Sequence, residues 1–261
     1  MNVELSLAAL DTLWEDLRLG RVPFPLEIRS HGDTFEVRKR IKAAVYGDLA
    51  RRGLAEERHV DDDLANALRL LAAPAVSVDL VALLDMGADE PVRAVAAARG
   101  RHGVLAVQRT LAVSVRTMRD NALAAAIVEL LPHVRAGAGN SVTYPAAALR
   151  EGRPRTVRAA PGGLLRTATP RSAVDSRLRA IAAITERPVL RAGQLGVNRA
   201  DDSGRPLRLP GIAWFDTDEG RYATTVSPGP DGEDWITLWP ADNARLAHRL
   251  AQIIAERVRT T

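Results

Sequence analysis

The sequence predicts a mixed α+β fold built on a central antiparallel sheet. Apolar residues recur at helical spacing near the N-terminus. In two later stretches they alternate with other residues or form short continuous segments of the length of a strand. Each of these strand-rich stretches is followed by one more helical pattern. Because the same order occurs twice, we expect an internal duplication that gives two pseudo-symmetric halves.

The N-terminal part predicts helices interrupted by one strand. A helix is expected from Leu7 to Leu17, and Pro23 and Pro25 then force an extended backbone, which predicts a strand. Asp33 and Glu36 predict a capping pair at the start of a second helix. The third helix is expected to turn three leucines inward and to stop at a proline: Leu64, Leu68, Leu71 and Pro74.

Strand patterns and a closing helix complete the first half. The strands are predicted at Val76 to Leu80, Val92 to Ala98, Val104 to Val107 and Leu111 to Val115. Gly100 to Gly103 predicts a tight hairpin turn between two of them. A helix that begins at Asp120 is expected to end at Pro132.

The second half repeats this order after a segment of linker composition. Six arginines and three prolines fall between Arg150 and Ser172. A helix is expected from Ala173 to Thr185, and Pro240 is expected to open the last helix. We therefore expect a single domain with an N-terminal half (1–149), an Arg/Pro/Gly-rich linker (150–172) and a C-terminal half (173–261). The strands of the second half are predicted at Val189 to Val197, Ile212 to Asp216, Arg221 to Val226 and Trp235 to Leu238.

Composition predicts a folded cytoplasmic protein. Of 261 residues, 46% are hydrophobic and 26% are charged, as in ordinary folded domains. The absence of cysteine excludes disulfides, thiolate metal sites and cysteine nucleophiles. The first residues lack the basic and apolar runs of a signal peptide, and no run of apolar residues is long enough to span a membrane. We therefore expect a cytoplasmic location.

The positive charge raises nucleic-acid binding as an alternative function. The net charge is +4, and the 36 basic residues include only two lysines, Lys39 and Lys42, so arginine accounts for the high isoelectric point. Clustered guanidinium groups between Arg150 and Ser172 could neutralise phosphates, but that segment has no aromatic side chain on which bases could stack. A solvated loop is therefore favoured, and a basic nucleic-acid-associated protein stays as the alternative.

No local motif supports catalysis or cofactor binding. The sequence has no G-x-S-x-G, and the histidines show no H-E-x-x-H spacing. The glycines of the run 136–140 lack the third glycine of a dinucleotide fingerprint and follow a helical pattern, so they predict a loop. An unrecognised hydrolase stays as a less favoured alternative, because a triad can form from distant residues. The five histidines are His31, His59, His102, His133 and His248.

Two carboxylate clusters predict structural roles. Asp61 to Asp63 precede a leucine-patterned helix, where they would cap its N-terminus and meet the positive end of its dipole. Asp216 to Gly220 begins like a calcium loop, but the fifth position is glycine and strand patterns flank the segment. A hairpin turn is therefore predicted there, and no metal or cofactor is expected.

Short patterns taken in order resemble the EspG family of type VII secretion chaperones over nearly the whole chain. One departure is that Val37 separates Glu36 from Arg38, which are often adjacent in the family. In the first half the patterns are Leu5-Ser6-Leu7, Trp14, Pro23-Phe24-Pro25-Leu26, His31-Gly32 with Thr34, Leu68 to Pro74, Val92 to Gly100 and Val104 to Val107. In the second half they are Ala192 to Val197, Asp216 with Gly220-Arg221-Tyr222, and Trp235 to Pro240.

The resemblance implies a central antiparallel sheet with flanking helical bundles and two pseudo-symmetric halves. It also implies a protein of the actinobacterial cytosol that binds the tip of helical PE/PPE heterodimers and keeps them soluble for export. No bond would be made or broken. A homodimer is a further arrangement that the sequence leaves open.

A chaperone of this kind needs an apolar platform with a polar rim, and aromatic side chains suit that role. Strand aromatics usually pack inward, so a core location is the alternative for them. Trp214 and Phe215 are adjacent, so on a strand they point to opposite faces and one of them can meet a partner. The candidate protein-binding residues are Gln194, Leu195, Trp214, Phe215, Tyr222, Trp235 and Trp239.

Overall fold

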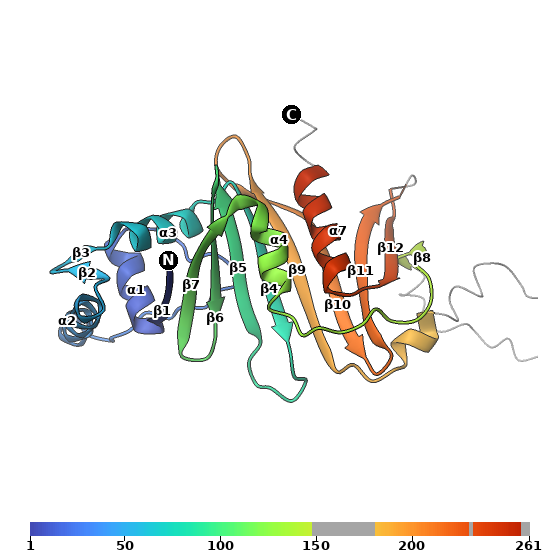
Figure 1. The fold of residues 1–261 in the computed structure, drawn as a ribbon, viewed down its shortest axis with the longest axis horizontal. Helices are drawn as coiled ribbons and strands as arrows, with labels where there is room; N and C mark the ends of the chain where they lie inside the picture. The colour runs from blue at the N-terminus through green and yellow to red at the C-terminus, as the bar shows by residue number, and fades with distance from the viewer. Residues whose placement is uncertain (148–180, 230–231, 257–261) are drawn as a thin grey trace, which may run out of the picture.

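A computed structural model of the chain describes residues 1–147, 181–229 and 232–256. Within these ranges, strands from both halves join one sheet that runs along the molecule (Figure 1). The strands of the first half are β1 (Asn2–Ser6), β4 (Val76–Leu83), β5 (Val92–Arg99), β6 (His102–Gln108), β7 (Ala112–Arg119) and β8 (Val142–Pro145). Those of the second half are β9 (Arg191–Ala200), β10 (Pro206–Thr217), β11 (Gly220–Pro228) and β12 (Asp234–Pro240).

The helices lie between some of these strands in the chain and after the last of them. In the first half they are α1 (Leu7–Asp16), α2 (Phe35–Arg51), α3 (Asp62–Ala72), the 3-10 turn η1 (Asp120–Ala122) and α4 (Leu123–Val128). The second half ends with α7 (Asn243–Glu256). A small separate ladder pairs β2 (Ala55–Glu56) with β3 (His59–Val60). No helix of the described ranges is long and apolar enough to cross a membrane.

The two halves meet at the pair β4 and β9, where Val78 lies opposite Val197. The strand order β1-β7-β6-β5-β4-β9-β10-β11-β12-β8 shows that the chain runs outward from this pair in both directions. The edge strands β1 and β8 pair antiparallel with β7 and β12. The prediction of a mixed fold with a large antiparallel sheet is therefore confirmed.

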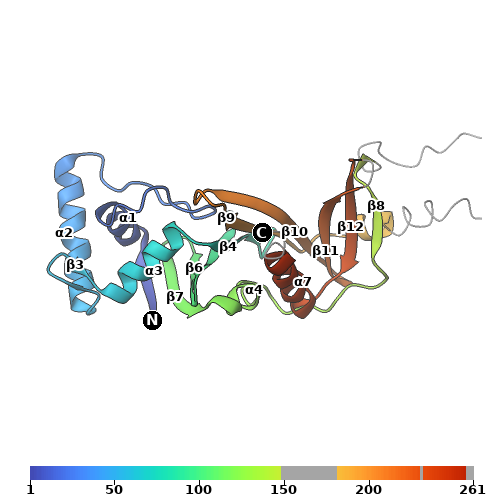
Figure 2. The same ribbon diagram turned by 90° about the horizontal axis from the view of Figure 1, so that it is seen from above.

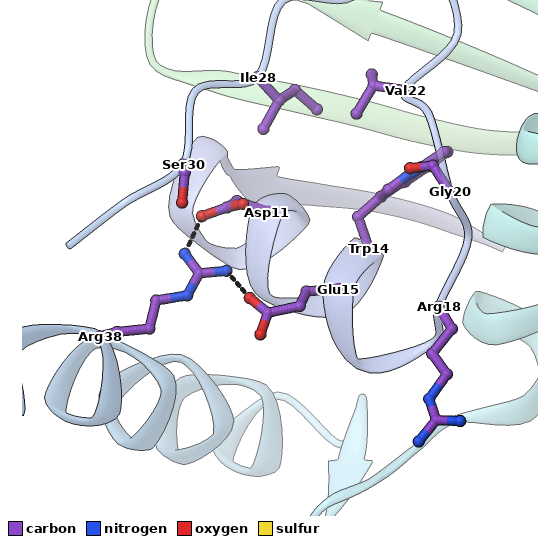
Figure 3. A pocket seen from close by; sticks show the side chains of 9 residues that line it. All are labelled: Asp11, Trp14, Glu15, Arg18, Gly20, Val22, Ile28, Ser30 and Arg38. Atoms are coloured by element: carbon purple, nitrogen blue, oxygen red, sulfur yellow. Dashed lines mark hydrogen bonds and ion pairs between the residues drawn. The ribbon is translucent and has the colours of Figure 1, made fainter. Parts of the chain in front are cut away.

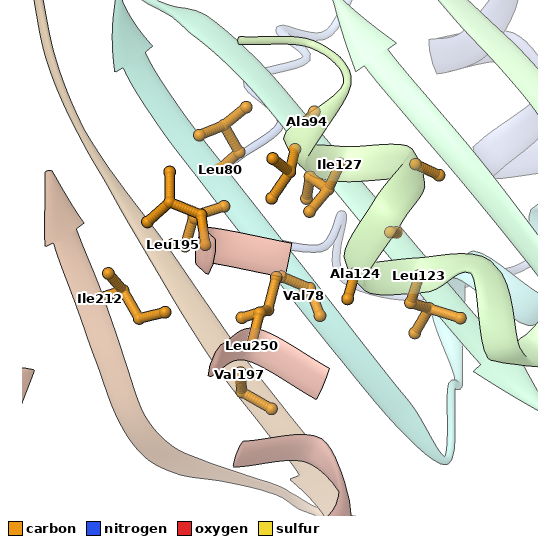
Figure 4. Packing of buried hydrophobic residues seen from close by; sticks show 14 of the residues in the cluster. Val78, Leu80, Ala94, Leu123, Ala124, Ile127, Leu195, Val197, Ile212 and Leu250 are labelled. Carbon is orange, nitrogen blue, oxygen red and sulfur yellow. The ribbon is translucent and has the colours of Figure 1, made fainter. Parts of the chain in front are cut away.

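Helices α4 and α7 cover one face of the central strands (Figures 2 and 4). Leu123 and Ile127 of α4 and Leu250 of α7 contact the side chains that alternate positions along each strand turn toward them. Complete burial of one such aliphatic side chain contributes roughly 1.5–3 kcal/mol. The sheet residues of this layer include Val78, Leu80, Ala94, Leu195, Val197 and Ile212.

Helices α1 and α3 cover the opposite face of the sheet where β5, β6 and β7 lie. Leu13 of α1 and Leu68 of α3 pack with Val95, Val104 and Val115, which are the alternate residues of β5, β6 and β7. The strands β5 and β6 are thus covered on both faces, whereas β1 and β7 keep exposed side chains such as Glu4 and Arg116 on the other face.

Three local predictions are wrong. The segment around Pro25, which was predicted as a strand, forms a turn. Proline has no N–H to pair with a neighbouring strand. The Glu27 N–H donates to a side chain, Gln108 Oε1, at 2.7 Å. The residue that caps α2 is Thr34, which accepts from the Val37 N–H, and not the pair Asp33 and Glu36.

The third correction concerns the last helix. Pro240 ends β12, and α7 begins at Asn243, where Asp242 accepts from the Arg245 N–H at 2.8 Å. The strands β1 and β8 were not predicted. Of the helix expected at 173–185, residues 181–185 are described and helical, whereas the linker at 150–172 lies outside the described residues.

Candidate functional site

Among the described residues, one row of the sheet face opposite α4 and α7 stays at least partly exposed where it crosses β4, β9, β10 and β11. The strand register places Val81 beside Gln194, Gln194 beside Ala213, and Ala213 beside Thr224. Gln194 and Ala213 are exposed although each has a paired strand on both sides, so nothing in the described part of the chain covers them. We call these four residues the open face, together with Phe215, which lies two positions after Ala213 on the same face of β10.

A polar border and an aromatic border flank the open face. On the β5 side, Arg93 pairs with Glu27 at 2.7 Å, and the Gln108 side-chain amide holds the Glu27 backbone. On the β12 side, Phe215 stacks on Tyr222 with ring centroids 5.8 Å apart. Tyr222 in turn belongs to a small buried cluster with Tyr144, Ile181 and Leu238. The open face is therefore a strip of apolar and polar residues with a polar border on the β5 side and an aromatic border on the β12 side.

An ion pair between a buried carboxylate and a half-exposed guanidinium lies next to this strip on the same face. The carboxylate of Asp79 accepts from Asn198 Nδ2 at 2.8 Å and from Arg208 Nη2 at 3.1 Å. The side chain of Asp79 is only 3% exposed, whereas that of Arg208 is 49% exposed. Because a buried carboxylate needs a counter-charge, Arg208 is held at this position.

Two glycines of β9 permit close packing on its two faces. A Cβ at Gly196 would lie 1.9 Å from a guanidinium nitrogen of Arg208, so this side chain can lie across the strand only over glycine. A Cβ at Gly193 would lie 2.8 Å from the indole of Trp214. The glycine spacing of the 192–197 pattern is therefore explained by one close approach on each face.

The sheet divides the seven predicted binding residues between its two faces. Gln194, Phe215 and Tyr222 lie on the side of the open face, and Trp214 and Phe215 do point to opposite faces. Leu195, Trp214 and Tyr222 are at most 1% exposed and form part of the interior. As partner contacts, all seven remain predictions. The members on the α4 and α7 side are Leu195, Trp214, Trp235 and Trp239.

The Asp216 to Gly220 segment is a hairpin turn, as predicted, and its first carboxylate is in a buried ion pair. Arg221 Nε donates to Asp216 Oδ1 at 2.6 Å, and the two side chains are 0% and 1% exposed. The same guanidinium bonds Asn243 at 2.5 Å and the Pro132 carbonyl at 3.0 Å, and it lies 4.7 Å from the ring centre of Trp214. This network ties the hairpin to the start of α7 and to the chain after α4.

A cavity of about 550 Å³ lies apart from the open face, between α1, the loop after it and α2 (Figure 3). Arg38 pairs there with Asp11 and Glu15. Outside the lining of the cavity, Lys42 pairs with Asp16 at 2.6 Å. Although burial opposes it, hydrogen bonds from Arg38 and the His31 backbone hold the pKa of Asp11 below its usual value. These charged groups serve to hold α2 on α1.

The remaining motifs take the structural roles that the sequence predicted. Asp61 caps α3 by accepting from the Leu64 N–H at 3.0 Å. Gly137, in the run 136–140, lies in a loop where a Cβ would come within 2.2 Å of the Tyr222 ring. Within the described ranges, no three histidine or carboxylate side chains are grouped so that they could hold a metal ion.

Comparisons with known proteins bear on the fold and the family. A family model described as EspG family matches residues 6–252. No curated protein matches the sequence. Among solved structures, the Mycobacterium tuberculosis type VII secretion system chaperone EspG5, in complex with a PE25-PPE41 dimer, is similar with a TM-score of 0.71 and 17% identity. The match covers 97% of this chain and 96% of that chain, so the two share the whole fold.

Proposed function

Because the chain belongs to the EspG family, we propose that it is a cytoplasmic chaperone that binds helical type VII secretion substrates and keeps them soluble for export. The substrates in this proposal are PE/PPE-like heterodimers. The observation that carries it is the family match over residues 6–252. The similar fold of EspG5, which is in complex with a PE25-PPE41 dimer, supports the same class of partner.

The open face supports a binding role in physical terms. The tip of a helical bundle is apolar and convex, so a chaperone needs an apolar strip with polar groups at its border. Val81, Ala213 and Phe215 supply apolar surface, and Gln194 and Thr224 supply hydrogen-bonding groups. A stable complex buries on the order of 1,200–2,000 Å², so the partner would also reach the borders of this strip.

We assign the predicted residues to two roles in this proposal. Gln194 and Phe215 contact the partner directly, because they lie on the open face. Leu195, Trp214 and Tyr222 are buried, so their role is to pack the strands that carry the open face. Trp235 and Trp239, half-buried on the other side, would contact a partner only if it extended around the edge of the sheet.

The proposed division into pseudo-symmetric halves is supported by the strand order. In both halves four strands run outward from the centre, and α4 follows β7 as α7 follows β12. The boundaries 1–149, 150–172 and 173–261 place β8 in the first half of the sequence, although it pairs with β12 of the second. The first half would thus supply the edge strand β8 to the second half within a single domain, with helical bundles at its flanks.

The proposed activity is binding without catalysis, so the test is complex formation. The chain would be co-expressed with a PE/PPE heterodimer and the products separated by size exclusion. We expect the heterodimer to co-elute with the chain and to aggregate when it is expressed alone. A heterodimer that stays soluble alone and elutes separately from the chain, for every PE/PPE pair encoded beside its gene, would contradict the proposal.

A further inference from the structure

Arg208 stands beside the open face with one edge of its guanidinium group bonded to the fold. Nη1 and Nη2 both donate to the Asp79 carboxylate, and Nη1 also donates to Asn198 Oδ1 at 3.2 Å. The carboxylate is buried in the sheet, whereas the guanidinium is half-exposed. The ion pair therefore presents its basic member to whatever covers the open face.

An adjacent edge of the same guanidinium is unused. A guanidinium carries five N–H donors, and these contacts occupy three of them. The Nε–H and the second Nη2–H remain, and they lie along one edge. Neither has an acceptor in the described part of the chain. Two parallel donors on one edge can bind two acceptor oxygens together.

This edge is held in place before any partner arrives. Asp79 fixes one end of the guanidinium, and the group lies across Gly196, where a Cβ would come within 1.9 Å of it. A free arginine loses much side-chain entropy when it is ordered by a partner, and an arginine already ordered by the fold loses less. Arg208 is therefore suited to recognition as well as to neutralising Asp79.

Charge decides which acceptor fits. Asp79 already neutralises Arg208, so a partner carboxylate buried at this edge would leave one negative charge without compensation. Neutral carbonyl oxygens avoid that cost. The last four carbonyl groups of a helix have no partner within the helix, and together they carry about half a negative charge.

We propose that the free edge of Arg208 receives backbone carbonyl oxygens at the C-terminal end of a helix in the partner's tip. Arg208 is then a specificity-determining residue, because it fixes which end of a helix can approach the open face. This inference rests on the proposed function, and it adds to it the orientation of the bound helix.

Two variants separate recognition from support of Asp79. Arg208→Lys keeps the charge and removes the two-donor edge. The double variant Asp79→Asn/Arg208→Gln removes both charges, so that no carboxylate is left unpaired. Arg109→Gln, an exposed arginine on the turn between β6 and β7, is the matched control. Each protein would be titrated calorimetrically with a PE/PPE heterodimer that co-elutes with the wild type, at low and high salt.

We expect both Arg208 variants to bind about tenfold more weakly or worse, with the thermal midpoint of the wild type, and the control to bind normally. Equal affinity for the wild type and Arg208→Lys would overturn the inference. A loss that also follows from neutralising a single acidic side chain of the partner, and that disappears at high salt, would overturn it in favour of a carboxylate. If no heterodimer co-elutes with the wild type before the titration, that result contradicts the proposed function, and with it this inference.

Discussion

Replacing Arg221 with methionine removes the basic member of the buried ion pair in the C-terminal half. The side chains of Arg221 and Asp216 are 0% and 1% exposed. Methionine fills much of the same space but donates no hydrogen bond, so Asp216 would keep only Arg191, whose Nη1 lies 3.6 Å away. The Asn243 side chain would also lose a donor.

The expected cost follows from the burial of this pair. Removing one partner of a buried ion pair costs about 3–5 kcal/mol, because the other charge stays buried without compensation. For a chain of this size, each kcal/mol lowers the thermal midpoint by about 2–4 °C, so Arg221→Met should unfold about 6–20 °C below the wild type. Urea unfolding followed by tryptophan fluorescence measures the free energy directly, since Trp214 lies against Arg221.

The control is the double variant Asp216→Asn/Arg221→Met, which removes the orphaned carboxylate. We expect it to be more stable than Arg221→Met alone, because no net charge is left in the core. A single variant within about 1 kcal/mol of the wild type, or a double variant less stable than the single one, would refute the reasoning.

Three further variants test local packing, capping and charge. Gly137→Ala should destabilise the chain by about 1–3 kcal/mol in thermal unfolding, because the new Cβ meets the Tyr222 ring; an unchanged midpoint would count against this contact. Asp61→Ala should cost about 1 kcal/mol in urea, and Asp61→Asn, which can still cap α3, should cost little; equal losses would argue against capping. The pKa of Asp11 is lowered in the folded state. Its pairing with Arg38 therefore stabilises the protein fully at pH values above the usual pKa of 3.8, and this stabilisation is lost as pH falls through the lowered pKa. The stability difference between wild type and Arg38→Gln should therefore shrink in acid, and an equal difference at neutral and acid pH would refute it.

Local patterns predicted most of the central strands because each carries its own apolar period. The strand β4 reads as alternation at Val76, Val78 and Leu80, and α3 turns Leu64 and Leu68 inward as expected. The edge strands were missed for a physical reason. β1 pairs with β7, where Val3 lies opposite Val115, and such remote pairing leaves little trace in a five-residue segment.

The candidate site was predictable only in part. Alternation alone placed Trp214 and Phe215 on opposite faces. Which face is covered depends on where α4 and α7 pack, and no local period encodes that choice. The pair of Asp79 and Arg208 joins residues 129 positions apart, so it became visible only when the strands were placed side by side.

The claim that the open face binds the partner is tested most directly at its centre. Ala213 is exposed on that face, and Ala244 of α7 is also exposed. We would measure the dissociation constant of a PE/PPE heterodimer for Ala213→Arg and Ala244→Arg. Ala213→Arg places a bulky charge on the open face and should weaken binding by about 100-fold or more, while Ala244→Arg should bind as the wild type does. Unchanged binding by a folded Ala213→Arg protein would contradict the account.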